Sequence, residues 1–132
     1  MREYGIGRSV PRIEDRRLLR GQGRYTDDHG FPGEAHLYVL RSPHAAARIG
    51  AIRTGEAARI PGVLAVLTGA DALSDGLGPI PSRVKRKAPD GTPNFEPPYH
   101  VLATRRTLFV GDAVVAIIAE TLAAARDAAE RV

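Results

Sequence analysis

Apolar residues form separate runs along this chain, and the runs differ in how regularly polar residues alternate with them. The runs over 63–68 and 113–119 read VLAVLT and AVVAIIA, without the alternation expected of a strand with one solvated face, and are typical of strands covered on both faces. The run over 35–42 reads AHLYVLRS, and the run over 47–53 alternates more regularly; both predict strands. A further strand over 106–110 completes a predicted set of five.

Two helices are predicted among these strands, and each has a threonine placed to cap its start. The first covers 55–60 and ends at Pro61, and the second covers 121–132. One additional helical turn is predicted over 70–73. The second helix has apolar residues at helical spacing, namely Leu122, Ala125, Ala129 and Val132.

Two breaks interrupt the pattern of strands and helices. Six of the ten prolines lie within 78–100, together with a basic run over 83–87. Because proline fixes φ and lacks a backbone donor, 78–100 is predicted to be a long surface loop. The pair Gly111-Asp112 lies between two apolar runs and predicts a hairpin or a tight bend.

The net charge of +4 belongs to the first 24 residues of the chain. Residues 1–24 hold seven arginines and three acidic residues, whereas 25–132 hold twelve basic and twelve acidic residues. Glycines accompany these arginines, and no hydrophobic period is sustained. Residues 1–24 are therefore predicted to form an extended basic arm, with a helical turn around 12–19, that becomes ordered on a partner surface. The folded domain is predicted over 25–132.

The composition excludes several classes of protein. The chain has no cysteine, which excludes disulfide frameworks, thiolate zinc sites, cysteine-ligated iron–sulfur clusters and cysteine nucleophiles. No apolar run reaches the roughly 18 residues of a membrane span, and the first residues lack the apolar run of a signal peptide. We therefore expect a soluble, cytoplasmic protein with no membrane partner.

No motif in the sequence identifies a catalytic, cofactor-binding or metal site. The four histidines lack the spacing of metal ligands, and the glycine pairs at 5 and 7 and at 21 and 23 lack the flanking strand and helix of a dinucleotide fingerprint. Asp27-Asp28 is typical of a turn, and Ser42-Pro43-His44 of a corner at a strand end. The arm and 83–87 are basic, but the chain has no aromatic platform or helix-turn-helix, which argues against nucleic-acid binding.

Four blocks of sequence occur in an order that carries a family resemblance. They read GIGRSVPRIEDRRLLRGQGRYTDD, PGEAHLYVLRSPHAAARI, PGVLAVLTGADAL and VGDAVVAIIAETLAAARDAAERV. In this order they resemble the a/b hammerhead domain of aldehyde oxidases and xanthine dehydrogenases, from the N-terminal region of the molybdenum hydroxylase large subunit. One departure is Ala46, where the family usually carries a second histidine after His44. The opening block is most similar to the aerobic carbon monoxide dehydrogenase type, through Gly7, Ser9, Arg12, Glu14-Asp15, Gly21, Gly23 and Asp27-Asp28.

The resemblance implies an α+β fold, an a/b hammerhead with a mixed β-sheet, projecting strands and two helices. It also implies oxidoreductase chemistry on a molybdenum–pyranopterin cofactor, with oxygen supplied by water and electrons leaving through iron–sulfur and flavin centres on partner subunits. The pterin-binding and catalytic segments of the family lie downstream, so the chain is expected to be a fragment, a split subunit or an isolated domain. In the family a further strand follows the last helix, and without it we expect an exposed apolar face and marginal stability.

These observations favour an N-terminal scaffold of the large subunit, inactive alone, with the remainder of that subunit and the iron–sulfur and flavin subunits as partners. The alternative is a free-standing interaction module that docks a partner protein through the basic arm. A nucleic-acid binder that uses the arm and 83–87 is the third hypothesis. The candidate subunit contacts are basic side chains, namely Arg8, Arg12, Arg16, Arg17, Arg41 and His44.

Overall fold

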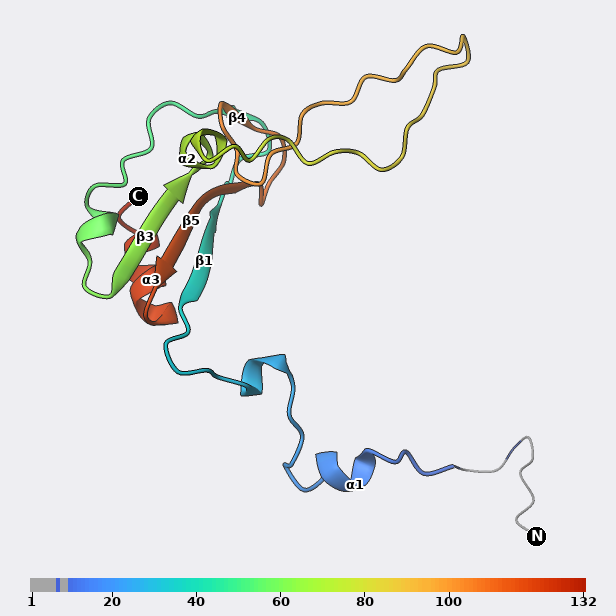
Figure 1. The fold of residues 1–132 in the computed structure, drawn as a ribbon, viewed down its shortest axis with the longest axis vertical. Helices are drawn as coiled ribbons and strands as arrows, with labels where there is room; N and C mark the ends of the chain where they lie inside the picture. The colour runs from blue at the N-terminus through green and yellow to red at the C-terminus, as the bar shows by residue number, and fades with distance from the viewer. Residues whose placement is uncertain (1–6, 8–9) are drawn as a thin grey trace. The chain divides into compact units, whose positions relative to one another are not determined.

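The computed structural model describes residue 7 and residues 10–132. Contacts within the chain divide it into two units, Met1–Pro32 and Gly33–Val132 (Figure 1). The described part of the first unit contains one short helix, α1 (Asp15–Leu18), and one 3-10 turn, η1 (Thr26–Asp28). Neither element has a buried residue. The helical turn predicted around 12–19 is confirmed, and Asp27-Asp28 lies in a turn as expected.

The second unit is built on a three-stranded sheet with the strand order β1-β5-β3. Its strands are β1 (His36–Arg41), β3 (Val63–Thr68) and β5 (Ala113–Ala119). In Figure 1 they lie side by side with β5 in the middle. Both pairings are antiparallel. The strands predicted over 35–42, 63–68 and 113–119 are therefore confirmed. Runs of apolar and β-branched residues of this length favour strands, because such side chains pack well on a pleated, buried surface.

A second, smaller sheet pairs β2 (Ala47–Arg48) with β4 (Arg106–Thr107), also antiparallel. The strands predicted over 47–53 and 106–110 therefore shorten to two residues each. The ladder ends soon after the hydrogen bond of 2.9 Å from Ile49 N to Arg105 O. The α+β class is confirmed, and the sheet pairings of the described chain are antiparallel throughout.

The helices differ from the sequence prediction at two places: the helix predicted over 121–132 ends at Ala129, and the helix predicted over 55–60 is not an α-helix. The helix α3 (Leu122–Ala129) begins at Thr121, whose Oγ1 accepts from Ala124 N at 3.1 Å. The turn predicted over 70–73 lies in α2 (Gly69–Ser74). The helix predicted over 55–60 is only a 3-10 turn, η2 (Ala57–Arg59). It stops there because Ile60 precedes a proline, which favours extended backbone, and Ile60 has ψ 131°.

The core lies between α3 and one face of the three-stranded sheet. Val115 and Ile117 of β5 are 0% exposed and are the largest fully buried side chains. Three alanines of α3 complete the buried cluster with Ala57 and Ala119. Because α3 contributes small side chains, its backbone can approach the sheet closely.

The proline-rich segment over 78–100 projects from the sheet as a long, irregular hairpin, drawn in yellow and orange in Figure 1. Ile80 N donates to Tyr99 O at 2.7 Å near its base, and Ala88 N donates to Thr92 O at 2.8 Å near its tip. Lys85 Nζ pairs with the Glu96 carboxylate at 2.7 Å between them. Most of its side chains are exposed, so the predicted surface loop is confirmed.

Candidate functional site

The two sheets meet at a corner where 42–46 runs beside 108–112. Ser42 N donates to Asp112 O and Gly111 N donates to Ser42 O, both at 2.8 Å. Gly111 has φ +89°, a conformation that glycine adopts without strain. The pair Gly111-Asp112 is therefore a tight bend between two sheets, one of the two alternatives that the sequence left open.

Asp112 and Thr107 hold the inner side of this corner. Asp112 is 3% exposed, and its Oδ2 accepts from Leu108 N at 2.9 Å. Thr107 is equally buried, and its Oγ1 accepts from Ala47 N at 3.2 Å. Each side-chain oxygen thus accepts a hydrogen bond from a backbone N–H. A buried N–H without a partner would lower the free energy of unfolding. Sequence reasoning missed Thr107 and identified Asp112 only as part of the Gly111-Asp112 bend, not as the acceptor for Leu108 N.

Two of the predicted subunit contacts lie beside the corner. Arg41 is exposed, and its Nη1 donates to Gly111 O at 2.9 Å. The His44 side chain is exposed. The Ser42 hydroxyl donates to His44 O and accepts from His44 N, both at 3.0 Å. The hydroxyl therefore closes a backbone corner, as expected, and is not paired with the imidazole as a nucleophile.

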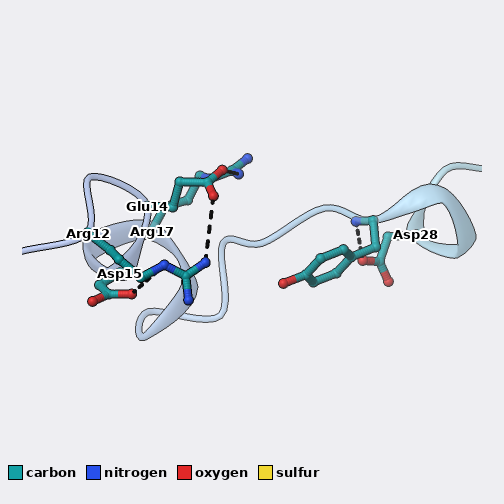
Figure 2. A network of polar contacts seen from close by, with 6 residues as sticks. Arg12, Glu14, Asp15, Arg17 and Asp28 are labelled. Carbon is teal, nitrogen blue, oxygen red and sulfur yellow. Dashed lines mark hydrogen bonds and ion pairs between the residues drawn. The ribbon is translucent and has the colours of Figure 1, made fainter.

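The other predicted contacts belong to the first unit. Figure 2 shows Arg12 beside Asp15 and Arg17 beside Glu14, with N–O distances of 3.8 and 3.2 Å. Arg16 is exposed and has no ion pair within the described residues. Arg8 lies outside the described residues. Two of these arginines thus find acidic partners inside the arm itself, and such exposed ion pairs contribute little to stability.

One face of the three-stranded sheet is apolar and is not part of the core. Directly paired residues of an antiparallel sheet share a face, and Leu37, Ile118 and Ala65 form one such row. Leu37 is 59% exposed. We define the uncovered face by six side chains that lie outside the core cluster: Leu37, Val39, Ala65, Leu67, Ala116 and Ile118. Of these six side chains, Leu37 is exposed and the other five are half-buried, so the face is apolar and partly open to solvent.

A shallow apolar groove of about 720 Å³ lies where the base of the 78–100 hairpin meets the corner. Tyr99 stacks on Phe109 at the groove, with ring centroids 6.2 Å apart. The buried Nδ1 of His100 has no hydrogen-bond partner among the described residues. The groove is lined chiefly by Leu73, Phe95, Pro97, Pro98, Tyr99 and Leu108. Arg105, Arg106 and Asp112 add charged groups to this lining, so the groove suits a segment that carries both apolar and polar side chains.

Gly69 is a further residue whose packing role sequence reasoning missed. A Cβ at this position would lie 2.5 Å from Ala103 O and 3.0 Å from Leu102 O. Because both atoms are backbone, the chain would have to move to admit any side chain. Gly69 therefore lets the segment before β4 pack against the end of β3.

Metal-ligating residues do not gather in the part of the chain that the structure describes. No three of its His, Asp and Glu side chains are placed so that they could hold a metal ion. Within the same residues, no helix is both long and apolar enough to cross a membrane.

Comparison with known proteins identifies the class and then the family. The family described as aldehyde oxidase and xanthine dehydrogenase, a/b hammerhead domain, matches residues 20–132. Among solved structures, quinoline 2-oxidoreductase from Pseudomonas putida 86 matches with a TM-score of 0.80 and 38% identity, over 96% of this chain and 15% of that one. Carbon monoxide dehydrogenase from Oligotropha carboxidovorans matches with a TM-score of 0.77 and 36% identity, over 96% and 14%.

Curated relatives match over nearly the whole chain. The nicotine 6-hydroxylase large subunit of Paenarthrobacter nicotinovorans is 39% identical, over 96% of this chain and 15% of its own length. The 6-hydroxypseudooxynicotine dehydrogenase complex subunit gamma of the same organism is 38% identical, over 99% and 16%. The carbon monoxide dehydrogenase large chain of Afipia carboxidovorans is 38% identical, over 97% and 14%.

The chain belongs to the aldehyde oxidase and xanthine dehydrogenase family and has its a/b hammerhead fold. It spans 14% to 16% of the length of these curated relatives. The relatives differ in the substrates that their names give, yet match at nearly equal identity, so similarity alone does not distinguish among substrates. The comparisons give no support to a free-standing module that docks through the basic arm.

Proposed function

We propose that this chain is a scaffold segment of the large subunit of a molybdenum-dependent oxidoreductase, with no catalytic group of its own. The observation that carries the proposal is the uncovered face. Exposed apolar surface costs roughly 25 cal/mol per Å² relative to burial, and contiguous apolar patches mark interaction sites. A sheet that is apolar on both faces, with a helix on only one of them, is built to be packed against further polypeptide.

The remainder of the large subunit is the partner that would cover this face. The relatives carry most of their length outside the matched segment, and their names describe a large subunit, a large chain and a complex subunit. Iron–sulfur and flavin subunits are the further partners that we propose for the assembled enzyme. The cytoplasm, where cysteine thiols are kept reduced and can serve as ligands to iron–sulfur clusters, is the proposed compartment.

The molybdenum–pyranopterin group, when bound in the assembled enzyme, supplies the redox centre for hydroxylation or dehydrogenation. Within the described residues no three His, Asp or Glu side chains gather to ligate a metal ion, and we propose no residue of this chain for holding the group. We therefore assign no step of the reaction to this chain. Its contribution is to hold neighbouring segments in place.

Co-purification from the native host tests the proposal. The tagged chain should be recovered with the other large-subunit segments and with molybdenum, measured by mass spectrometry and metal analysis. Leu37→Lys with Val39→Lys should lower both recoveries at least tenfold, because two charges would have to be buried in the contact. Val84→Lys, on a side chain that is 62% exposed in the hairpin, is the matched control and should change neither recovery.

Equal recovery of molybdenum with the face variant and the control would overturn the scaffold proposal. Recovery of the chain as a monomer, without any other large-subunit segment, would overturn it as well. Circular dichroism of the purified variants should first confirm that both remain folded.

A further inference from the structure

Two arginines face each other across the small sheet. Arg48 of β2 is directly opposite Arg106 of β4. The neighbouring pair is hydrogen-bonded, since Ile49 N donates to Arg105 O, so the Arg48–Arg106 pair is the non-hydrogen-bonded kind, in which side chains lie closest. Like charges directly opposite each other destabilise a sheet. A sheet of two residues per strand has few other contacts to offset that cost.

A third arginine and two alanines complete a hollow at this place. The arginine hollow has a volume of about 520 Å³ and is lined by Ala46, Ala47, Arg48, Arg105 and Arg106. All three arginines are exposed. The ion pairs of the described residues lie in the arm and in the hairpin, so none involves these three guanidinium groups. The carboxylate on the groove side is the buried Asp112, which lines the groove with Arg105 and Arg106 and accepts a hydrogen bond from Leu108 N.

The arginine hollow borders the apolar groove, because Arg105 and Arg106 line both. A ligand that fills the two together needs negative charge beside apolar groups. Guanidinium groups bind carboxylates in a bidentate geometry that ammonium groups cannot match. The body from 25 to 132 carries no net charge, which removes the extended positive field that nucleic acids require.

We propose that the arginine hollow and the apolar groove bind one extended segment of a partner polypeptide, in which acidic residues are flanked by apolar ones. The inference rests on the proposed scaffold function and adds the chemistry of a second contact, distinct from the uncovered face. The carboxylates of the segment relieve the repulsion between Arg48 and Arg106. Its apolar side chains pack on Tyr99 and Leu108 in the groove.

Fluorescence anisotropy with the whole chain tests this inference. The probe is a fluorescein-labelled ten-residue peptide in which Asp-Glu pairs alternate with Leu-Phe pairs. Arg48→Gln with Arg106→Gln should weaken binding at least tenfold. Arg83→Gln with Arg86→Gln removes the same charge from the hairpin, where no described ion pair involves either residue, and should weaken binding less than twofold.

Arg106→Glu separates a binding role from a structural one. It should abolish peptide binding while leaving the melting temperature equal or higher, because opposite charges across a ladder stabilise it. A lower melting temperature together with lost binding would overturn the inference in favour of a structural role.

Equal losses of peptide affinity in the two double glutamine variants would also overturn the inference. Tighter, arginine-dependent binding of inorganic phosphate or of a single-stranded oligonucleotide would overturn it as well. Because the peptide assay uses this chain alone, its failure leaves the uncovered face, tested by co-purification, unaffected.

Discussion

The two faces of the three-stranded sheet are both apolar, but α3 covers one face and leaves the other outside the core. On one face, Val115 and Ile117 are 0% exposed beneath α3. On the other, Ile118 is half-buried and Leu37 is 59% exposed. Apolar content alone therefore does not decide which face is a core. The segment after β5 determines which face is buried, because Thr121 caps α3 and this helix packs over one face only.

This contrast separates what holds the domain together from what remains available for contact. A covered face contributes to the stability of the isolated chain, whereas an uncovered apolar face contributes only when a partner removes it from water. Substitutions on the two faces should consequently affect different measurements.

The largest effect should come from truncating the covered face. Ile117→Ala should lower the free energy of unfolding of the isolated chain by about 3–4 kcal/mol, since it leaves a cavity beneath α3. Ile118→Ala, one residue along the same strand, should cost about 1 kcal/mol or less, because its side chain is already partly in water. Denaturant unfolding followed by circular dichroism measures both. Equal losses from the two variants would show that the second face is also packed in solution.

A smaller effect should follow from overfilling the covered face. Ala125 of α3 is 0% exposed in the core, and Ala125→Leu should cost about 1–3 kcal/mol because the added atoms push α3 from the sheet. Ala116→Leu adds the same atoms to the uncovered face and should change the free energy of unfolding by about 0.5 kcal/mol at most. A loss with Ala116→Leu as large as that with Ala125→Leu would contradict the contrast between the faces.

The sequence is sufficient to predict the central elements of this fold. The strands over 63–68 and 113–119 are predictable because short, unbroken apolar runs bounded by glycine, proline or polar residues are typical of buried strands. The helix after Thr121 is predictable from its cap and its apolar spacing. The missing alternation in these strands also indicates that both faces are apolar, and only the structure shows which face α3 covers.

The corner and the arginine hollow cannot be predicted in the same way. Both depend on pairing between residues about 60 positions apart, such as Ala47 with Thr107, and local propensity contains no information on such pairs. The basic residues that stand out in the sequence are chiefly the arm arginines, because they are concentrated in one segment. Arg48 and Arg106 become notable only when the ladder places them opposite each other. The roles of Arg41 and His44 as subunit contacts stay predictions.

The smallest effect should appear at the end of β3, where capping rather than burial on either face holds the chain. The Thr68 side chain and backbone N–H both donate to the Asp71 carboxylate, at 2.6 and 2.7 Å, and these bonds hold the pKa of Asp71 below its ordinary value. A lowered pKa in the folded state means that the stabilisation is present above about pH 4 and is lost as the pH falls through the folded pKa. Asp71→Asn should therefore be slightly less stable than the parent at pH 7, and the difference should shrink toward pH 2.

Ser74→Ala is the control. It removes a hydroxyl that donates to Asp71 O at 2.8 Å and does not titrate, so its difference from the parent in stability should be independent of pH. Parallel pH dependences for the two variants, measured by thermal unfolding, would contradict the capping account and attribute the change to α2 as a whole.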